Sequence, residues 1–135
     1  MKKKSKLFSA HTFKKSNFPT DFDGKMDMEI ADRWFKFIQS GDKVVEGRVL
    51  KTKFLTLVTG TILNITNESN ENIRCRVIDI RPYSSFRKYL EQEGLRRTLP
   101  GVSTVAEGLD VYAQYFPPGL DEKLGVIAIE MVKIE

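Results

Sequence analysis

The chain has 135 residues, of which 41% are hydrophobic, and this length and composition suit one compact domain with a single core. Cys75 is the single cysteine and His11 the single histidine, which excludes an intramolecular disulfide and predicts neither a metal site nor a cofactor. No apolar run approaches the roughly 20 residues of a membrane span, and no signal peptide is recognisable, so we expect an intracellular protein, cytoplasmic or nuclear.

Charge is distributed unevenly along the chain, whose formal net charge is +4. Residues 1–20 hold six lysines and no acidic residue, so we expect residues 1–24 to form a flexible basic tail ahead of a domain at residues 25–135. Within that domain, residues 73–98 carry seven basic and three acidic residues, whereas residues 99–135 carry two and six. A basic region of this kind is consistent with a polyanion such as nucleic acid, and equally with solvated surface charge.

The first part of the domain predicts an extended segment at residues 25–29, then a helix and a strand. The apolar residues of the helical segment fall at i, i+4, i+7 and i+8, which predicts one buried face formed by Ile30, Trp34, Phe37 and Ile38. Gly41 is expected to end the helix. Residues 44–50 alternate as a strand does, and this alternation places Glu46 and Arg48 on the same face.

The middle of the chain predicts two strands joined by a polar turn. A helical or irregular piece at residues 51–59 precedes a strand at residues 61–65, and the turn TNESNEN leads into the strand IRCRVIDIRPY. In that strand the apolar positions change from odd to even numbers after Val77. The change of parity predicts a β-bulge or sharp bend near Val77.

The C-terminal third predicts two helices and a final strand. Ser84 or Ser85 is expected to cap a helix that ends near Glu93, and the segment LRRTLPG reads as a loop. A second helix is expected over residues 105–116, and residues 125–134 read as a strand in the interior of a sheet. The connections are too short for a run of parallel crossovers. The order of elements therefore predicts an α+β fold around a bent, mostly antiparallel sheet or small barrel.

The segment SGDKVVEGRV, residues 40–49, holds the candidate site, because Lys43, Glu46 and Arg48 lie close together around Gly47. A carboxylate and a guanidinium on one strand face can accept from and donate to the edge of a nucleobase. They can also form an ion pair that only supports the fold. Lys43 is likewise either a cation beside a cleft or a solvated turn lysine. Both alternatives stay open at this level.

The pattern Gly41-x-Lys43-x-x-Glu46-x-Arg48 is followed in order by IDIRPY, by a helix with Phe86, by LPGVSTVAEGLDVYAQYF and by GVIAIEMVKI. From about Met26 to Glu135 this order resembles the ASCH domain, the activating-signal-cointegrator homology domain of the PUA-like superfamily. The resemblance implies a small, bent β-barrel, mostly antiparallel and flanked by helices, with a cleft beside the strand that carries the motif.

The resemblance also implies a function, namely nucleic-acid binding, with RNA as the expected partner, whereas the lack of a long apolar run predicts no membrane association. One branch of the family hydrolyses acetylated cytidine nucleosides, and ribonuclease activity has been attributed to a few relatives, so a hydrolase acting on acylated nucleosides or RNA is the alternative. A protein-interaction adaptor is a second alternative. If the chain is an enzyme, its catalytic residues would be Lys43, Glu46 and Glu107. Glu46 stands where that branch has a threonine, which puts the amidohydrolase activity in doubt.

The remaining candidates are basic and aromatic side chains. The expected nucleic-acid contacts, besides the motif residues, are Arg74, Arg76, Arg81, Arg96 and Arg97. The spacing of Trp34, Phe37 and Phe86 favours core packing, whereas Tyr83, Tyr112 and Tyr115 can also face a cleft. Glu107 has a structural alternative as well, because Thr104-x-x-Glu107 is the pattern of a capping box at a helix N-terminus.

Overall fold

The computed structural model describes residues 24–134. Except for Gly24, the predicted basic tail lies outside these residues. The elements in chain order are β1 (Lys25–Glu29), α1 (Asp32–Ser40), β2 (Val45–Val49), the 3-10 helix η3 (Thr52–Thr56), β3 (Ile62–Thr66), β4 (Asn72–Tyr83), α2 (Phe86–Glu93), α3 (Leu95–Thr98), α4 (Val105–Ala113), α5 (Leu120–Leu124) and β5 (Val126–Lys133). The predicted α+β class is confirmed.

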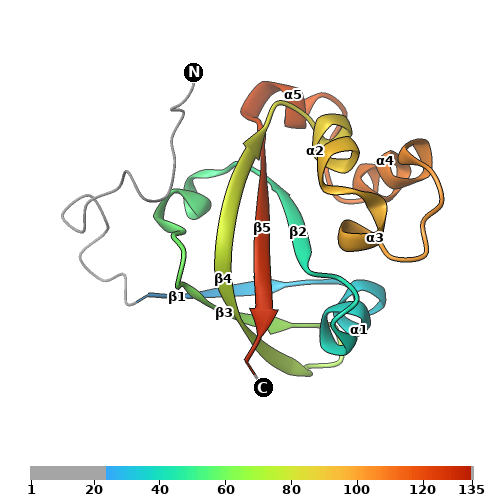
Figure 1. Ribbon diagram of the computed structural model, residues 1–135. Helices are drawn as coiled ribbons and strands as arrows, with labels where there is room; N and C mark the ends of the chain where they lie inside the picture. Colours follow the sequence, from blue (N-terminus) through green and yellow to red (C-terminus); the bar gives the residue numbers. More distant parts are fainter. Residues whose placement is uncertain (1–23, 135) are drawn as a thin grey trace.

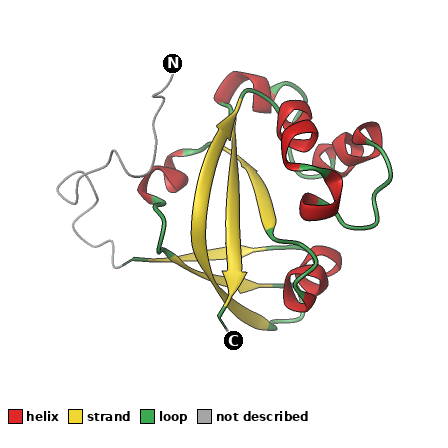
Figure 2. Cartoon of the chain, viewed as in Figure 1, coloured by secondary structure: helices red, strands yellow, loops and turns green. Residues whose placement is uncertain are grey.

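The strands form one curled sheet in the order β1-β3-β4-β5-β2 (Figure 2). β1 pairs with β3 in parallel, whereas the pairs β3–β4, β4–β5 and β5–β2 are antiparallel, so the prediction of a mostly antiparallel sheet is confirmed. The predicted interior position of β5 is also confirmed. The sheet has the shape of a half-barrel, with β1 and β2 as its two edges.

The curvature of the sheet depends on β4, its longest strand. The register of β4 against β5 shifts between Val77 and Asp79, which confirms the bend predicted near Val77. Residues 72–76 of β4 pair with β3, and residues 75–83 pair with β5. The irregularity therefore lies where β4 passes from one neighbour to the other, and a bulge at such a place bends the strand and increases its twist.

The helices gather on the side of the sheet where β2 lies (Figure 1). α1 ends at Gly41, as predicted, in a left-handed conformation with φ of 89° that glycine adopts readily. Ser85 rather than Ser84 caps α2, because its side chain accepts a hydrogen bond from the amide of Lys88. Among residues 24–134, no helix is both long and apolar enough to cross a membrane.

Four details of the sequence-based prediction were wrong. Phe35 is fully buried in α1, whereas Phe37 is only half-buried, because Ile30 precedes the helix and the buried face must be counted from Asp32. The segment taken for a loop contains the single turn of α3, and α5 was not expected. α4 ends at Ala113 instead of continuing to Phe116.

Candidate functional site

The candidate site is built on β2, the edge strand that pairs with β5. Gly41 ends α1 and directs the chain toward this strand, and the amide of Lys43 donates a hydrogen bond to the carbonyl of Phe37. Alternation along β2 then places Glu46 and Arg48 on one face, as the sequence predicted. The motif spacing therefore brings three ionic side chains together within a single short turn and strand.

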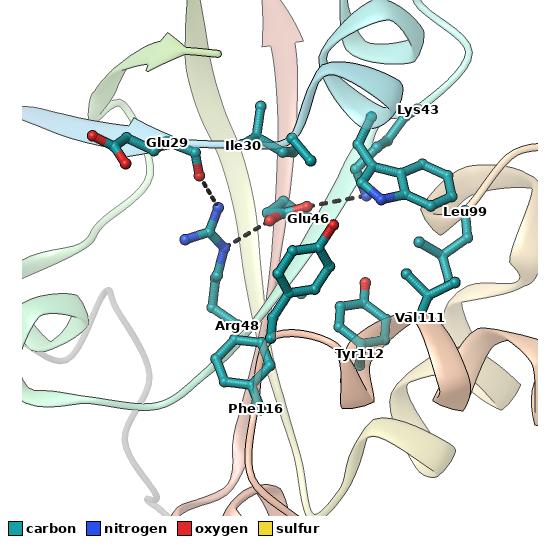
Figure 3. Close-up of a pocket in the computed structure, with 13 residues that line it drawn as sticks. Glu29, Ile30, Lys43, Glu46, Arg48, Leu99, Val111, Tyr112 and Phe116 are labelled. Carbon is teal, nitrogen blue, oxygen red and sulfur yellow. Dashed lines mark hydrogen bonds and ion pairs between the residues drawn. The ribbon is translucent and has the colours of Figure 1, made fainter. Parts of the chain in front are cut away.

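Lys43, Glu46 and Arg48 form one connected ion cluster, which we call the pocket cluster (Figure 3). Lys43 Nζ lies 3.1 Å from Glu46 Oε1, and Arg48 Nε lies 2.6 Å from Glu46 Oε2. Arg48 Nη2 also donates to the backbone carbonyl of Glu29 at 2.6 Å. Glu46 is 6% exposed, so the carboxylate is held between two cations in a largely dry environment.

Lys43 is a buried anchor, 2% exposed, rather than a solvated turn lysine. Besides Glu46, its ammonium group donates to the carbonyls of Val45, at 2.9 Å, and of Thr98. An ammonium has three donors, and these three acceptors satisfy all of them. Burial lowers the pKa of Lys43, and the attraction of Glu46 opposes part of that shift. Lys43 therefore ties β2 to the C-terminal end of α3.

Glu46 and Arg48 keep hydrogen-bonding capacity that the protein does not use. Burial alone would raise the pKa of Glu46, but Lys43 and Arg48 outweigh burial and hold that pKa below its usual value. Each carboxylate oxygen of Glu46 has one cationic partner, Lys43 or Arg48, and keeps a further lone pair that can accept a hydrogen bond. Arg48 Nη1 has no hydrogen-bond partner among residues 24–134.

The pocket cluster lines a cavity of about 120 Å³, which we call the pocket. Its walls are aromatic and aliphatic, and they come from the β1–α1 connection, from α1, from the residue after α3 and from the end of α4 with the residues that follow it: Ile30, Ala31, Trp34, Leu99, Val111, Tyr112, Tyr115 and Phe116. Figure 3 shows Tyr112 and Phe116 across from Glu46 and Arg48. The pocket thus combines apolar walls with unused donors and acceptors.

Gly47 has a packing role beside the pocket. A Cβ atom at this position would lie 2.6 Å from Tyr89 Cε2 and 2.7 Å from the Tyr89 hydroxyl oxygen, which is too close for any residue with a side chain. The Tyr89 hydroxyl lies 3.1 Å from the hydroxyl of Tyr112, whose ring stacks on Phe86 with centroids 4.2 Å apart. Gly47 therefore lets Tyr89 pack against β2 and support the wall of the pocket that Tyr112 provides.

The predicted phosphate-binding arginines do not converge on the pocket. Arg74, Arg76 and Arg96 are exposed and do not line it. Arg81 and Arg97 instead belong to a second ion cluster, in which they meet Asp79, Glu93 and Glu130. Arg81 binds Glu93 at 2.7 Å and Glu130 at 2.9 Å, and Tyr83 donates to Glu93 at 2.5 Å. The charge of these two arginines is therefore compensated inside the protein.

Glu107 also lies away from the pocket. The Thr104 hydroxyl accepts a hydrogen bond from the Glu107 amide at 3.1 Å, and Glu107 Oε1 accepts one from the Ser103 amide at 3.1 Å. This is the reciprocal arrangement of a capping box, with the glutamate bound one residue before the cap. Glu107 does not line the pocket, so Lys43, Glu46 and Glu107 do not form one constellation. Within residues 24–134, no group of three or more histidine, cysteine or carboxylate side chains is arranged to hold a metal ion.

Sequence reasoning missed several residues that line the pocket. Trp34 was assigned to the core by its helical spacing, and it is both buried and part of the pocket wall. The sequence allows Tyr112 and Tyr115 either a core or a cleft position, and both line the pocket. Phe116 was expected on the buried face of a longer helix. The helical spacing of Val105, Leu109, Tyr112 and Phe116 predicts a helix, but it does not say which partner the apolar face of that helix meets.

Comparison with known proteins agrees with this fold. A family model described as ASCH domain matches residues 28–135. Hypothetical protein PH0355, known from a crystal structure, is 35% identical with a TM-score of 0.73, and the match covers 82% of this chain and 99% of that one. Protein PF0455 from Pyrococcus furiosus, solved by NMR, is 34% identical with a TM-score of 0.66, covering 82% and 98%. No protein with a curated description matches significantly.

Proposed function

This chain belongs to the ASCH domain family, and from that premise we propose that its pocket binds a single nucleobase of RNA. The proposal rests above all on one observation, a buried carboxylate beside a half-buried guanidinium, both facing an aromatic pocket with hydrogen-bonding capacity left over. The PUA-like fold of the family, which is commonly linked to RNA binding, points in the same direction.

The chemistry of the pocket suits the edge of a base. Nucleobases carry N–H donors beside carbonyl or ring-nitrogen acceptors, so Glu46 can accept from the base while Arg48 Nη1 donates to it. The faces of a base stack on aromatic side chains, and Tyr115, which is 51% exposed, lies at the mouth of the pocket in a suitable place. A cavity of about 120 Å³ is smaller than the roughly 300 to 1,000 Å³ of sites for drug-sized ligands, so one ring is the expected occupant.

Contacts to the RNA backbone would have to lie elsewhere. Arg74, Arg76 and Arg96 are exposed and remain candidates for phosphate contacts, whereas Arg81 and Arg97 are engaged with carboxylates. Phosphate contacts through exposed arginines are independent of base identity and weaken as salt concentration rises. We therefore propose that the pocket supplies base specificity and that exposed cations add salt-dependent affinity.

The fluorescence of Trp34 offers a direct test, because it is the single tryptophan and it lines the pocket. The protein would be titrated with ribonucleosides and with short single-stranded RNA, and bound base should quench the emission. Arg48→Ala should weaken binding about 10-fold or more, because it removes a charge-assisted hydrogen bond. Arg87→Ala is the matched control, since Arg87 is exposed on α2 and does not line the pocket. Equal affinities for the two variants, or no response to any base, would contradict the proposal.

A further inference from the structure

A second cavity of about 430 Å³ continues from the mouth of the pocket, and we call it the groove. The pocket and the groove share Glu29, Ile30, Ala31 and Tyr115 as lining residues. The other walls of the groove come from the turn between β3 and β4, through Asn67, Glu68 and Asn70. Because four residues line both cavities, a ligand held in the pocket can extend into the groove without leaving the protein surface.

The groove carries negative charge and amide groups. Its charged lining residues are Glu29 and Glu68, and it has no lysine or arginine among its walls. Arg48 lines the pocket but not the groove, and it is paired with Glu46. Arg33 lies over Trp34, 4.4 Å from the ring centroid, but it lines neither cavity. No cation therefore compensates the two carboxylates along the described walls of the groove.

The turn that forms the groove is held in place by its own hydrogen bonds. Asn67 Oδ1 accepts from the amides of Ser69 and Glu71, at 3.2 and 2.8 Å, and Asn67 Nδ2 donates to the side chain of Glu71. Glu68 Oε1 accepts from the amide of Asp32 at 2.9 Å, which fixes Glu68 against the start of α1. Glu68 is therefore a fixed acceptor whose second oxygen remains for a ligand, and little of its side-chain freedom remains to be lost on binding.

We propose that the groove is a ribose subsite that accepts the sugar hydroxyls of the bound nucleoside and excludes phosphate. This inference rests on the proposed binding of a nucleobase in the pocket. Carboxylates accept hydrogen bonds from ribose hydroxyls, and a 2′-hydroxyl contact distinguishes RNA from DNA. The same carboxylates repel a phosphate group, because like charges at short distance disfavour each other. The ligand is therefore a ribonucleoside with free 2′ and 3′ hydroxyls, either alone or at the 3′ end of an RNA.

The test compares ligands that differ only in the sugar. The base with the strongest Trp34 response would be offered as a ribonucleoside, a 2′-deoxyribonucleoside and a ribonucleoside 3′-monophosphate, and then within a short RNA that ends in a 3′-hydroxyl or a 3′-phosphate. We expect the deoxy form to bind about 10-fold more weakly than the ribose form, because it loses a hydrogen bond to a charged group. The 3′-phosphate form should also bind about 10-fold more weakly, because it loses the 3′-hydroxyl donor and is repelled by the carboxylates. Raising the salt concentration should reduce the phosphate effect but not the deoxy effect.

The variant Glu29→Gln with Glu68→Gln isolates the electrostatic part of the proposal. Glutamine keeps an oxygen that can accept from the Asp32 amide, and Glu29 bonds to Arg48 through its backbone carbonyl, so both structural contacts remain possible. The double variant should bind the 3′-phosphate form nearly as well as the ribonucleoside. Glu91→Gln, an exposed charge change on α2 outside both cavities, should leave the discrimination intact.

The possible results separate this inference from the function on which it rests. Lack of binding by every nucleoside and RNA would overturn the proposed base pocket and, with it, the ribose subsite. Binding of the 3′-phosphate or deoxy form as tightly as the ribonucleoside would overturn the ribose subsite alone. Discrimination against phosphate that persists in the double variant would also overturn it, because the carboxylates would then not be its cause. Circular dichroism and thermal unfolding would verify that each variant is folded.

Discussion

The two ion clusters use the same residue types and differ in what surrounds them. In the pocket cluster, two cations share one buried carboxylate, and the cluster faces the pocket. In the second cluster, Arg81 and Arg97 meet three carboxylates from β4, α2 and β5, and none of these five residues lines the pocket or the groove. Unused hydrogen-bonding capacity beside a cavity, rather than the mere presence of charge, marks the first as a candidate binding site.

The largest contrast between the clusters should follow removal of one carboxylate from each. Glu46→Gln leaves Lys43 and Arg48 with no carboxylate partner in a buried site, and we expect it to lower the free energy of unfolding by about 3 to 5 kcal/mol. Glu130→Gln removes a carboxylate whose side chain is 25% exposed and leaves Asp79 and Glu93 in place, so its loss should stay below about 1 kcal/mol. Urea unfolding of both variants measures the difference, and equal losses would contradict it.

A smaller contrast separates two glycines, Gly47 in β2 and Gly108 in α4. Gly47→Ala forces a methyl group against the rigid ring of Tyr89, and we expect a loss of about 1 to 3 kcal/mol in the free energy of unfolding. In Gly108→Ala, the added Cβ would lie 2.8 Å from Leu90 Cδ1, at the flexible end of a side chain, and the helix gains up to about 1 kcal/mol from the better helix former. Gly47→Ala should therefore lower the free energy of unfolding more than Gly108→Ala does, as urea unfolding would measure. Similar losses would show that the Tyr89 ring moves aside as easily as the Leu90 side chain.

The smallest expected effect is on the acid sensitivity of the fold. Burial opposes the ionisation of Glu46 and Glu93, but their cationic partners and, for Glu93, the Tyr83 hydroxyl hold both pKa values below the usual 4.5. A lowered pKa in the folded state contributes stability above the unfolded pKa, and this stability is lost as the pH falls through the folded pKa. The free energy of unfolding should fall as the solution is acidified below about pH 4.5.

Glu46→Gln should show a flatter acid profile than the wild type, because only Glu93 of this pair still titrates. The comparison requires urea unfolding at a series of acidic pH values for both proteins. Parallel profiles would mean that Glu46 does not have a lowered pKa in the folded state.

Local patterns in the sequence predicted the features that depend on neighbouring residues. Alternation placed Glu46 and Arg48 on one face, and their side chains are 2.6 Å apart. The parity change after Val77 located the irregularity of β4, and the serine pattern located the cap of α2. Each of these features follows from backbone periodicity or from a contact within four residues, so the sequence alone contains the information.

The features that sequence reasoning missed depend on distant partners or on very short elements. α3 and α5 have four and five residues, which is too short for a helical period to emerge. Arg81 and Arg97 looked like free cations because Glu130, which binds both, lies in β5, far from both residues in the sequence. The sequence could not decide between a cleft cation and a turn lysine at Lys43, because its acceptor at Thr98 is 55 residues away. Burial and charge compensation are therefore properties of the folded molecule.

The hydrogen bond from Arg48 to the carbonyl of Glu29 has a mechanical consequence. Glu29 belongs to β1 and Arg48 to β2, which are the opposite edges of the curled sheet. The Arg48 side chain therefore connects the two edges across the open side of the half-barrel. The pocket lies beside this hydrogen bond, between the two edges. A ligand held there would touch both edges of the sheet and add a second connection between them.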